Sequence, residues 1–152
     1  MLFRSIHRVA RPHVARLGRV PGTQRYSDVA RHRDNETVAG VLIVRVESSL
    51  LYFNVSHVQE ELRRQLADAG SDLRLVVWDL STSPYVDIAG GRLLGETQRE
   101  LAARGVAMRV VEAHAPVRDL IRKELGMTVG EVSRRISIDD AIAASASATP
   151  VP

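Results

Sequence analysis

The sequence predicts an α/β protein in which amphipathic helices cover a sheet that contains parallel strands. Short runs of β-branched and other aliphatic residues alternate along the chain with longer segments whose apolar residues recur every three or four positions. The three longest of these segments are each followed by glycine, a residue favoured just after a helix. The resulting order is strand, strand, helix, strand, helix, strand, helix, and such alternation favours right-handed crossovers between parallel strands.

Four apolar runs are predicted strands. Residues 41–46 are short and rich in β-branched side chains, which is typical of a buried strand. The run at 50–53 follows closely and is interpreted as a second strand. Residues 73–78 and 106–111 are the third and fourth. We expect further strand before residue 40.

Two amphipathic segments between these strands predict helices over 55–69 and 88–104. Asn54 or Ser56 can cap the first helix and Asp87 can cap the second, because these residues stand just before or within the first turn. In both helices the apolar residues share one face that we expect to pack on the sheet. They are Val55, Val58, Leu62, Leu66 and Ala69 in the first helix, and Leu93, Leu94, Thr97 and Leu101 in the second.

A third helix is predicted to begin near Pro116, since proline suits the first turn, and to end at Gly126. Its expected inner face holds Val117, Leu120, Ile121 and Leu125. Residues 138–144 are expected to form a short fourth helix. Residues 143–152 are rich in Ala, Ser, Thr and Pro and are predicted to be a disordered tail. Because the amphipathic helices need only one sheet face, we expect them all on one side.

Composition excludes several kinds of site and segment. With 152 residues, 45% of them hydrophobic, the chain can bury the core of one domain. It has no cysteine, which excludes disulfides and thiolate chemistry. Its longest unbroken aliphatic run, residues 41–44, is far shorter than the roughly 20 apolar residues of a spanning helix. The basic N-terminus also lacks the apolar stretch and cleavage site of a signal peptide.

The basic charge of the chain is concentrated at its N-terminus. Residues 1–33 carry eight arginines and one acidic side chain, whereas residues 34–152 carry 13 basic and 17 acidic side chains. Such an arm is typical of nucleic-acid binding, of anionic lipid binding, or of a segment that follows a membrane helix on its cytoplasmic side. A solvated, partly disordered leader is the plain structural alternative. With Phe3 and Tyr26 as its only aromatic residues, the arm gives base stacking little support, so we expect no nucleic-acid partner.

No catalytic, cofactor or metal motif stands out, so the chain is predicted not to be an enzyme and to hold no metal. The phosphate-loop motif needs a Gly-Lys pair, but the only lysine is Lys123, within the third predicted helix. The five histidines show no metal-ligand spacing. Asp79 and Asp87 are a conceivable acid–base pair. However, no nucleophile or cofactor motif accompanies them, and strand ends and helix caps are common structural uses of aspartate.

The loop that precedes the second helix carries the most informative polar residues. Asp87 can accept hydrogen bonds from the free N–H groups of the first helical turn, and its charge would repel a phosphate placed there. Gly90 and Gly91 permit the close approach of a ligand or of a neighbouring strand. Local physics therefore favours a structural cap. The adjacent hydroxyl side chains are a candidate hydrogen-bonding rim: Ser81, Thr82 and Ser83.

Several segments resemble the SulP-type anion transporters and their STAS domains. Residues 14–29, VARLGRVPGTQRYSDV, resemble the junction that follows the last membrane helix of those transporters. Residues 40–45 (GVLIVR) and 50–54 (LLYFN) resemble the first full strand and an apolar-aromatic-Asn signature of the family. Residues 76–96 resemble the conserved loop of the STAS domain, which such transporters carry at their cytoplasmic C-terminus. The resemblance covers roughly residues 9–127.

The resemblance implies a STAS-like α/β fold, a four- or five-stranded mixed sheet with three to four helices packed on one side. It divides the chain into a basic juxtamembrane arm at 1–13, a STAS domain at 14–142 and the tail at 143–152. In anti-sigma-factor antagonists with this domain, a serine just after the aspartate of this helix start is phosphorylated. Here Ile88 and Ala89 follow the aspartate, so this switch position cannot accept a phosphate. This difference counts against the alternative interpretation, a stand-alone partner-switching protein of the anti-sigma-factor-antagonist type.

The resemblance also implies a function, that of a non-catalytic regulatory and interaction module of a sulfate or other anion transporter, on the cytoplasmic face of the membrane. The expected partners are the membrane domain of the same transporter and a homodimer mate. STAS domains have been proposed as nucleotide sensors, so GTP, GDP or ATP is the expected regulatory ligand. Its rim would comprise Leu51, Tyr52, Phe53, Asn54, Ser81, Thr82, Ser83, Asp87, Ile88, Ala89 and Gly90.

Overall fold

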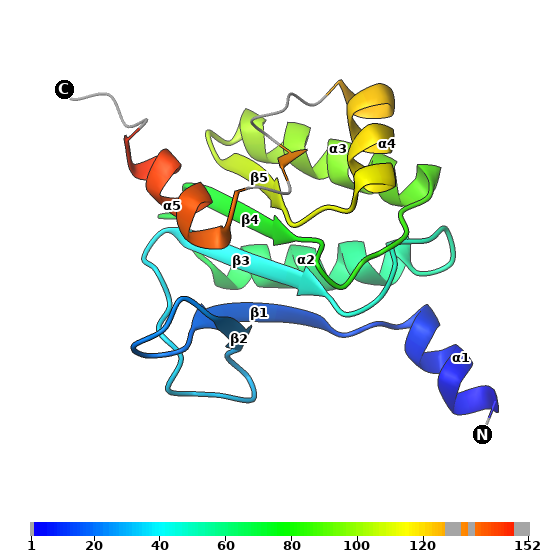
Figure 1. Cartoon of the computed structure of the whole chain (residues 1–152), viewed down its shortest axis with the longest axis horizontal. Helices are drawn as coiled ribbons and strands as arrows, with labels where there is room; N and C mark the ends of the chain where they lie inside the picture. Colours follow the sequence, from blue (N-terminus) through cyan, green and yellow to red (C-terminus); the bar gives the residue numbers. More distant parts are fainter. Residues whose placement is uncertain (1, 127–131, 134–135, 148–152) are drawn as a thin grey trace.

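The computed structural model of the chain describes residues 2–126, 132–133 and 136–147. Its centre is a sheet with the strand order β2-β1-β3-β4-β5-β6 (Figure 1). The strands are β1 Val14–Arg19, β2 Tyr26–Asp28, β3 Val41–Val46, β4 Leu75–Asp79, β5 Ala107–Val111 and β6 Val132–Ser133. The helices are α1 Leu2–Ala10, α2 Val55–Asp68, α3 Ile88–Ala103, α4 Ala115–Leu125 and α5 Ile138–Ser147.

The sheet is mixed, as predicted. Strands β3 to β6 run parallel, whereas β1 is antiparallel to β3 and β2 is antiparallel to β1. The predicted strands at 41–46, 73–78 and 106–111 are confirmed as β3, β4 and β5, the last two starting slightly later than predicted. Strands β1 and β2 supply the strand expected before residue 40. The described residues form six strands, with the short β2 at one edge, where four or five were predicted.

The parallel centre of the sheet is apolar on both faces. All five residues of β4 are buried, as expected of a parallel strand that is covered on both sides. Because successive side chains of a strand point to opposite faces, the strands feed two separate cores. Leu42, Val44, Val76 and Trp78 belong to the core beneath α2, α3 and α4. Ile43, Leu75, Val77 and Val111 belong to the core beneath α5.

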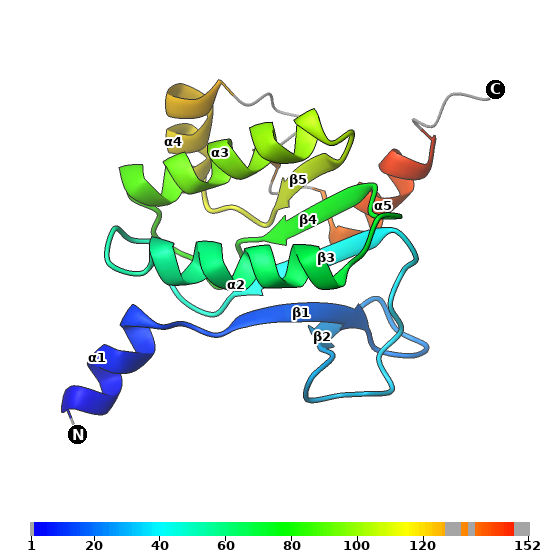
Figure 2. The same ribbon diagram turned by 180° about the vertical axis from the view of Figure 1, so that it is seen from behind.

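Helices α2, α3 and α4 pack on one face of the sheet, and Figure 2 shows α2 and α3 in front of the strands. They confirm the three longer predicted helices, with ends that differ from the prediction by one residue. Gly126 ends α4 in the left-handed conformation that glycine adopts readily, as its position predicted. The predicted inward-facing residues that are buried include Val58, Leu62, Leu66, Leu93, Leu94, Thr97, Leu101, Val117 and Ile121.

Helix α5 packs on the opposite face of the sheet, against β4 and β5 (Figure 1). The predicted short fourth helix is therefore confirmed, but its expected place beside the other helices is wrong, because the second apolar face of the sheet also needs cover. The helix continues to Ser147, so the first part of the predicted disordered tail is helical. Residues 148–152 of that tail lie outside the described residues.

Residues of the basic arm form α1, which projects from the body of the domain in both views (Figures 1 and 2). Two hydrogen bonds tie its end to the body. Asn54 Nδ2 donates to Val9 O at 3.1 Å, and His57 Nε2 donates to Pro12 O at 3.1 Å. In the described part of the chain no helix combines the length and the apolar character that a bilayer crossing requires.

The start of α5 is fixed by a capping box and by a bond to β2. Ser137 N donates to Asp140 Oδ2 at 3.0 Å, and Asp140 N donates to Ser137 Oγ at 3.1 Å. These bonds from the Ser137 backbone and hydroxyl lower the pKa of Asp140. Tyr26 Oη donates to Asp139 Oδ1 at 2.5 Å. Burial, reinforced by this bond, raises the pKa of Tyr26.

We expect Ser137→Ala to raise the pKa of Asp140 toward its ordinary value, because the hydroxyl that bonds the carboxylate is lost. A lowered folded-state pKa stabilises the protein above the unfolded-state pKa, and this contribution is lost as pH falls through the folded-state value. Below pH 4 the variant should therefore lose less stability than the wild-type chain. Carboxyl NMR titration measures the pKa directly. Ser147→Ala is the control, because among the described residues Ser147 bonds to carbonyls of its own helix and not to Asp140. An unchanged Asp140 pKa in Ser137→Ala would contradict the capping role.

Candidate functional site

Asp87 joins two turns of the chain at the start of α3. Its Oδ1 accepts from Gly90 N at 2.9 Å, so the predicted helix cap is confirmed. Its Oδ2 accepts from Tyr52 N at 2.7 Å, a bond to a turn 35 residues away in the sequence. The negative charge at this position also interacts favourably with the dipole of α3. One carboxylate thus orders the helix start and the turn that precedes α2.

Gly90 allows the chain that precedes α2 to contact the first turn of α3. A Cβ atom added at Gly90 would lie 2.6 Å from Leu50 O and 2.9 Å from Leu50 Cβ. At Gly91 the nearest atom to an added Cβ would be Leu120 Cδ2, at an ordinary contact distance of 3.8 Å. The close approach predicted at this glycine pair is therefore made at Gly90 by the protein's own chain.

The predicted strand at 50–53 is wrong. Leu50 makes an isolated parallel bridge to Val86, and the chain then turns. Asn54 is buried and closes this turn, because its Oδ1 accepts from Leu51 N at 3.0 Å. Asn54 occupies the N-cap position of α2 as predicted, but its side chain makes no capping hydrogen bond. The amide is used to hold the turn instead.

Of the predicted rim residues, Ser81 and Thr82 are exposed and Ser83 is buried, and the hydroxyls of Thr82 and Ser83 bond within the chain. Thr82 Oγ1 donates to Val46 O at 2.8 Å, and the buried Ser83 Oγ donates to Ser48 O at 2.7 Å. Both hydroxyls therefore anchor the loop after β4 to the end of β3. Ser81 lines a different cavity, on the side of α5.

Four large apolar side chains are exposed around Asp87. The exposed fractions are 75% for Tyr52, 44% for Phe53, 72% for Tyr85 and 56% for Ile88. The rings of Tyr52 and Phe53 meet edge to face, with centroids 5.3 Å apart. We call these four residues the aromatic face. Tyr85 is absent from the predicted rim, although an aromatic residue in a polar loop was a signal that could have revealed it.

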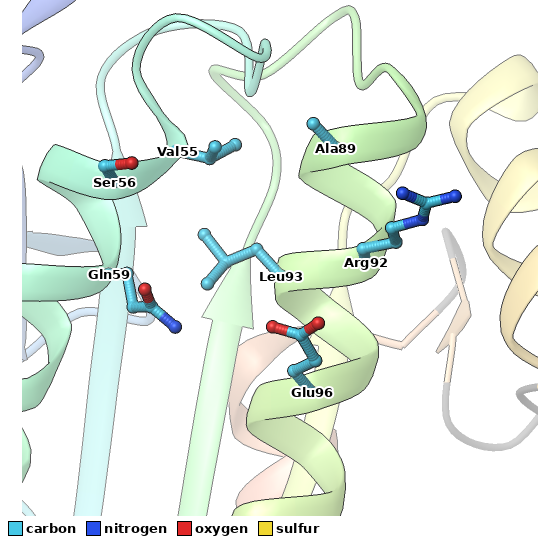
Figure 3. A pocket seen from close by; sticks show the side chains of 7 residues that line it. All are labelled: Val55, Ser56, Gln59, Ala89, Arg92, Leu93 and Glu96. Atoms are coloured by element: carbon cyan, nitrogen blue, oxygen red, sulfur yellow. The ribbon is translucent and has the colours of Figure 1, made fainter.

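A shallow groove separates the first turns of α2 and α3 (Figure 3). Leu93 points from α3 toward α2 and faces Val55 across the groove. The other lining residues are Ser56, Gln59, Ala89, Arg92 and Glu96. The groove measures about 180 Å³, which is below the roughly 300–1,000 Å³ of typical small-molecule pockets. From the predicted rim, Ala89 lines this groove.

Asp79 and Asp87 are both occupied by structural partners. Arg45 Nε and Nη2 donate to Asp79 Oδ2 at 2.8 and 2.6 Å, and Ser81 N donates to Asp79 Oδ1 at 2.8 Å. Arg45, Asp79 and Ser81 line a cavity of about 220 Å³ beside the start of α5. Among the residues that the structure describes, no three histidine or acidic side chains gather in a way that could hold a metal ion.

A family model described as STAS domain matches residues 32–134. This span exceeds half of the chain, and it holds the parallel strands, the two turns joined by Asp87 and the aromatic face. The chain belongs to the STAS domain family. The predicted resemblance and the predicted STAS-like fold are confirmed.

Plant sulfate transporters are among the relatives of this STAS domain. It is 26% identical over 144 residues to "Probable sulfate transporter 3.5" of Arabidopsis thaliana, which covers 94% of this chain and 23% of that protein. It is 32% identical over 111 residues to "Low affinity sulfate transporter 3" of Stylosanthes hamata, which covers 66% of this chain and 17% of that protein. The chain therefore spans less than a quarter of the length of these relatives.

Solved structures share the fold. The murine Solute Carrier 26 family member A9 anion transporter, in its inward-facing state, matches with a TM-score of 0.82 and 22% identity, over 96% of this chain and 24% of that one. The anti-sigma factor antagonist SpoIIAA, in its unphosphorylated form, matches with a TM-score of 0.54 and 14% identity, over 72% of this chain and 93% of that one. The fold is more similar to that of the anion transporter than to that of SpoIIAA, and the match extends over more of this chain.

The adjacent glycines of α3 should respond in opposite directions to alanine. We expect Gly90→Ala to lower the free energy of unfolding by about 1–3 kcal/mol, because the new methyl group would press on the Leu50 backbone. Gly91→Ala should raise it by up to about 1 kcal/mol, because alanine favours the helix and has room there. Urea unfolding measures both. Equal effects at the two positions would show that the contact with Leu50 does not restrict Gly90.

Asp87→Ala should lower the free energy of unfolding by about 2 kcal/mol, because the helix cap and the bond from Tyr52 N are lost together. Asp119→Ala is the control, since it removes an exposed carboxylate from α4. Its effect should stay within about 0.5 kcal/mol. Urea unfolding again gives both values. A loss for Asp87→Ala no larger than that of the control would count against the joining role of Asp87.

Proposed function

We propose that this STAS domain is a non-catalytic regulatory and interaction module of a sulfate or related anion transporter. Relatives that are named as sulfate transporters match up to 94% of the chain. Because the chain spans only a minor part of those proteins, transport would need a membrane domain, with which this domain would cooperate. The eight arginines of residues 1–33 fit a place on the cytoplasmic side, where basic residues gather next to membrane helices.

The observation that carries this proposal is the aromatic face. Exposed large apolar side chains mark contact surfaces, and tyrosine is enriched at the centres of protein interfaces. Here the rings of Tyr52 and Phe53 are in contact, and the exposed Tyr85 and Ile88 stand two residues before and one residue after Asp87. The two turns that present these side chains are joined by Asp87, so docking would order few groups and lose little entropy. The partner proposed for this face is the membrane domain of the same transporter. A homodimer mate is the other partner to be tested.

The mechanism would be coupling between two arrangements of the transporter. A partner or ligand that binds one arrangement of the STAS domain and membrane domain more tightly shifts the equilibrium by its difference in affinity. The domain itself would not need to change shape. It would need only a contact that one state of the membrane domain makes better than the other.

Tyr85→Ser and Ile88→Ser test this proposal in the full-length transporter. We expect each to reduce anion uptake at unchanged protein level, because truncating an interface anchor costs about 2 kcal/mol or more of binding. The melting temperature of the 152-residue chain should not change, since both side chains are exposed. Arg104→Ser, at the other end of α3, is the control. Wild-type uptake by both face variants would refute a docking role for the aromatic face.

A second candidate is the binding of GTP, GDP or ATP at the same end of the domain. Arg92 is exposed beside the groove and is a phosphate partner of suitable chemistry, while the exposed Tyr52 ring could stack on a base. Asp87 opposes a phosphate at the start of α3, so only weak affinity is expected.

Amide NMR titration of the chain with each nucleotide separates the two candidates. Saturable shifts at 51–54 and 87–92 that are lost in Arg92→Gln, but kept in Arg99→Gln on the same helix, would support nucleotide binding. Unchanged spectra at millimolar nucleotide would remove that candidate and leave docking.

A further inference from the structure

A basic cleft lies between α1, the link from α1 to β1 and the segment that follows β2, outside the aromatic face and the groove. It has a volume of about 390 Å³. Its lining residues are Arg8 in α1, Arg11, Pro12 and His13 in the link to β1, Arg31 after β2 and Glu47 after β3. Arg8, Arg11 and Arg31 are exposed to solvent in this cleft, and none of them takes part in the ion pairs found among the described residues.

The buried carboxylate of Asp28 organises two sides of the basic cleft. It is 7% exposed, and it accepts from His13 Nε2 at 2.7 Å and from Ala30 N at 2.8 Å. The backbone oxygen of Asp28 also accepts from Arg31 N at 3.2 Å. His13, which stands near Arg11 in the link, and the turn that carries Arg31 are therefore held by one residue. Their relative positions are set without any ligand.

The link between α1 and β1 is fixed from its other side as well. Glu47 N donates to His13 O at 2.9 Å, and His57 Nε2 donates to Pro12 O at 3.1 Å. Arg11 N donates to His7 O at 2.9 Å and so continues the last turn of α1. The backbones that carry the arginines are thus ordered in advance, which lowers the entropy cost of binding a ligand.

Three guanidinium groups around one cleft repel one another, and among the described residues that line it Glu47 is the one carboxylate. A doubly negative group placed between them would relieve this repulsion. Guanidinium N–H groups form a planar fork that matches the oxygen atoms of phosphate and sulfate in paired hydrogen bonds. The volume of the cleft falls within the range of about 300–1,000 Å³ typical of small-molecule sites, which leaves room for a carrier of the anionic group.

We infer that the basic cleft binds a phosphate or sulfate group, either as a free dianion or as the headgroup of an anionic phospholipid. Arg8, Arg11 and Arg31 would donate to its oxygen atoms, and Asp28 would act as a positioning residue through His13 and the Arg31 turn. This site shares no residue with the aromatic face, so the test of anion binding is independent of the proposed docking role.

Calorimetric titration of the 152-residue chain with sodium sulfate and with sodium phosphate tests the free-ion form. Ionic strength is held constant with sodium chloride, because salt screens exposed charges. Co-sedimentation with phosphatidylcholine vesicles, with and without phosphatidylinositol 4,5-bisphosphate, tests the headgroup form. Arg11→Gln and Arg31→Gln should each weaken binding about tenfold, as expected for the loss of a charge-assisted hydrogen bond. Arg63→Gln, which removes the same charge from an exposed position on α2, should not.

Glu47→Gln should change the affinity for the anion in the opposite direction. It removes the carboxylate that opposes the anion, so binding should tighten by a few fold, while Glu60→Gln on the exposed face of α2 leaves it unchanged. Thermal unfolding of each variant shows whether the variant is folded. Glu47 N bonds through the backbone, so this variant keeps the link to His13.

Binding of free sulfate or phosphate with these variant effects supports a free-dianion site. Binding to the phosphoinositide vesicles alone, with the same effects, supports a headgroup site. Absence of binding in both assays overturns the inference. Weakening by Arg63→Gln as large as that by Arg11→Gln also overturns it, because the attraction would then come from the overall charge and not from the cleft.

Discussion

The central constraint on this domain is a parallel sheet that is apolar on both faces. Trp78 and Val76 of β4 point into one core and Val77 and Leu75 into the other, so neither face can be left to solvent. Helices α2, α3 and α4 cover one face, and α5 covers the other. Helix α5, which comes after β6 in the chain, therefore packs on the second face, and Tyr26 donates a hydrogen bond to Asp139 at its start. The position of the last helix follows from the second core.

Local sequence patterns predicted the elements whose residues are buried on one side at a regular spacing. The inner positions of α3, such as Leu94 and Leu101, belong to this class, whereas residues 41–46 were predicted from a short β-branched run that is buried on both faces. The run at 50–53 was predicted wrongly because apolar composition alone does not show exposure, and Tyr52 and Phe53 point to solvent. The face that α5 covers was also beyond local patterns, since it depends on contacts between segments far apart in the sequence.

The candidate site illustrates the same limit at the level of single side chains. Asp87 as a cap follows from its place before a helix, but its second bond, to Tyr52 N, depends on how two turns meet in space. The hydroxyls of Thr82 and Ser83 were expected at a rim, yet they bond to backbone oxygens at the end of β3. A polar residue in a loop has several partners within reach, and its sequence neighbours do not reveal which one it takes.

Asn54 also connects α1 to the rest of the domain mechanically. Its Nδ2 holds Val9 O at the end of α1, while its Oδ1 holds the backbone of the turn that carries Tyr52. His57 in α2 holds Pro12 O one turn further on. A displacement of α1 would thus act on the turn before α2 through Asn54 and on α2 itself through His57, by bonds that do not involve the sheet. A change in the position of α1 would therefore be felt first at Asn54, whose side chain bonds both α1 and the turn before α2.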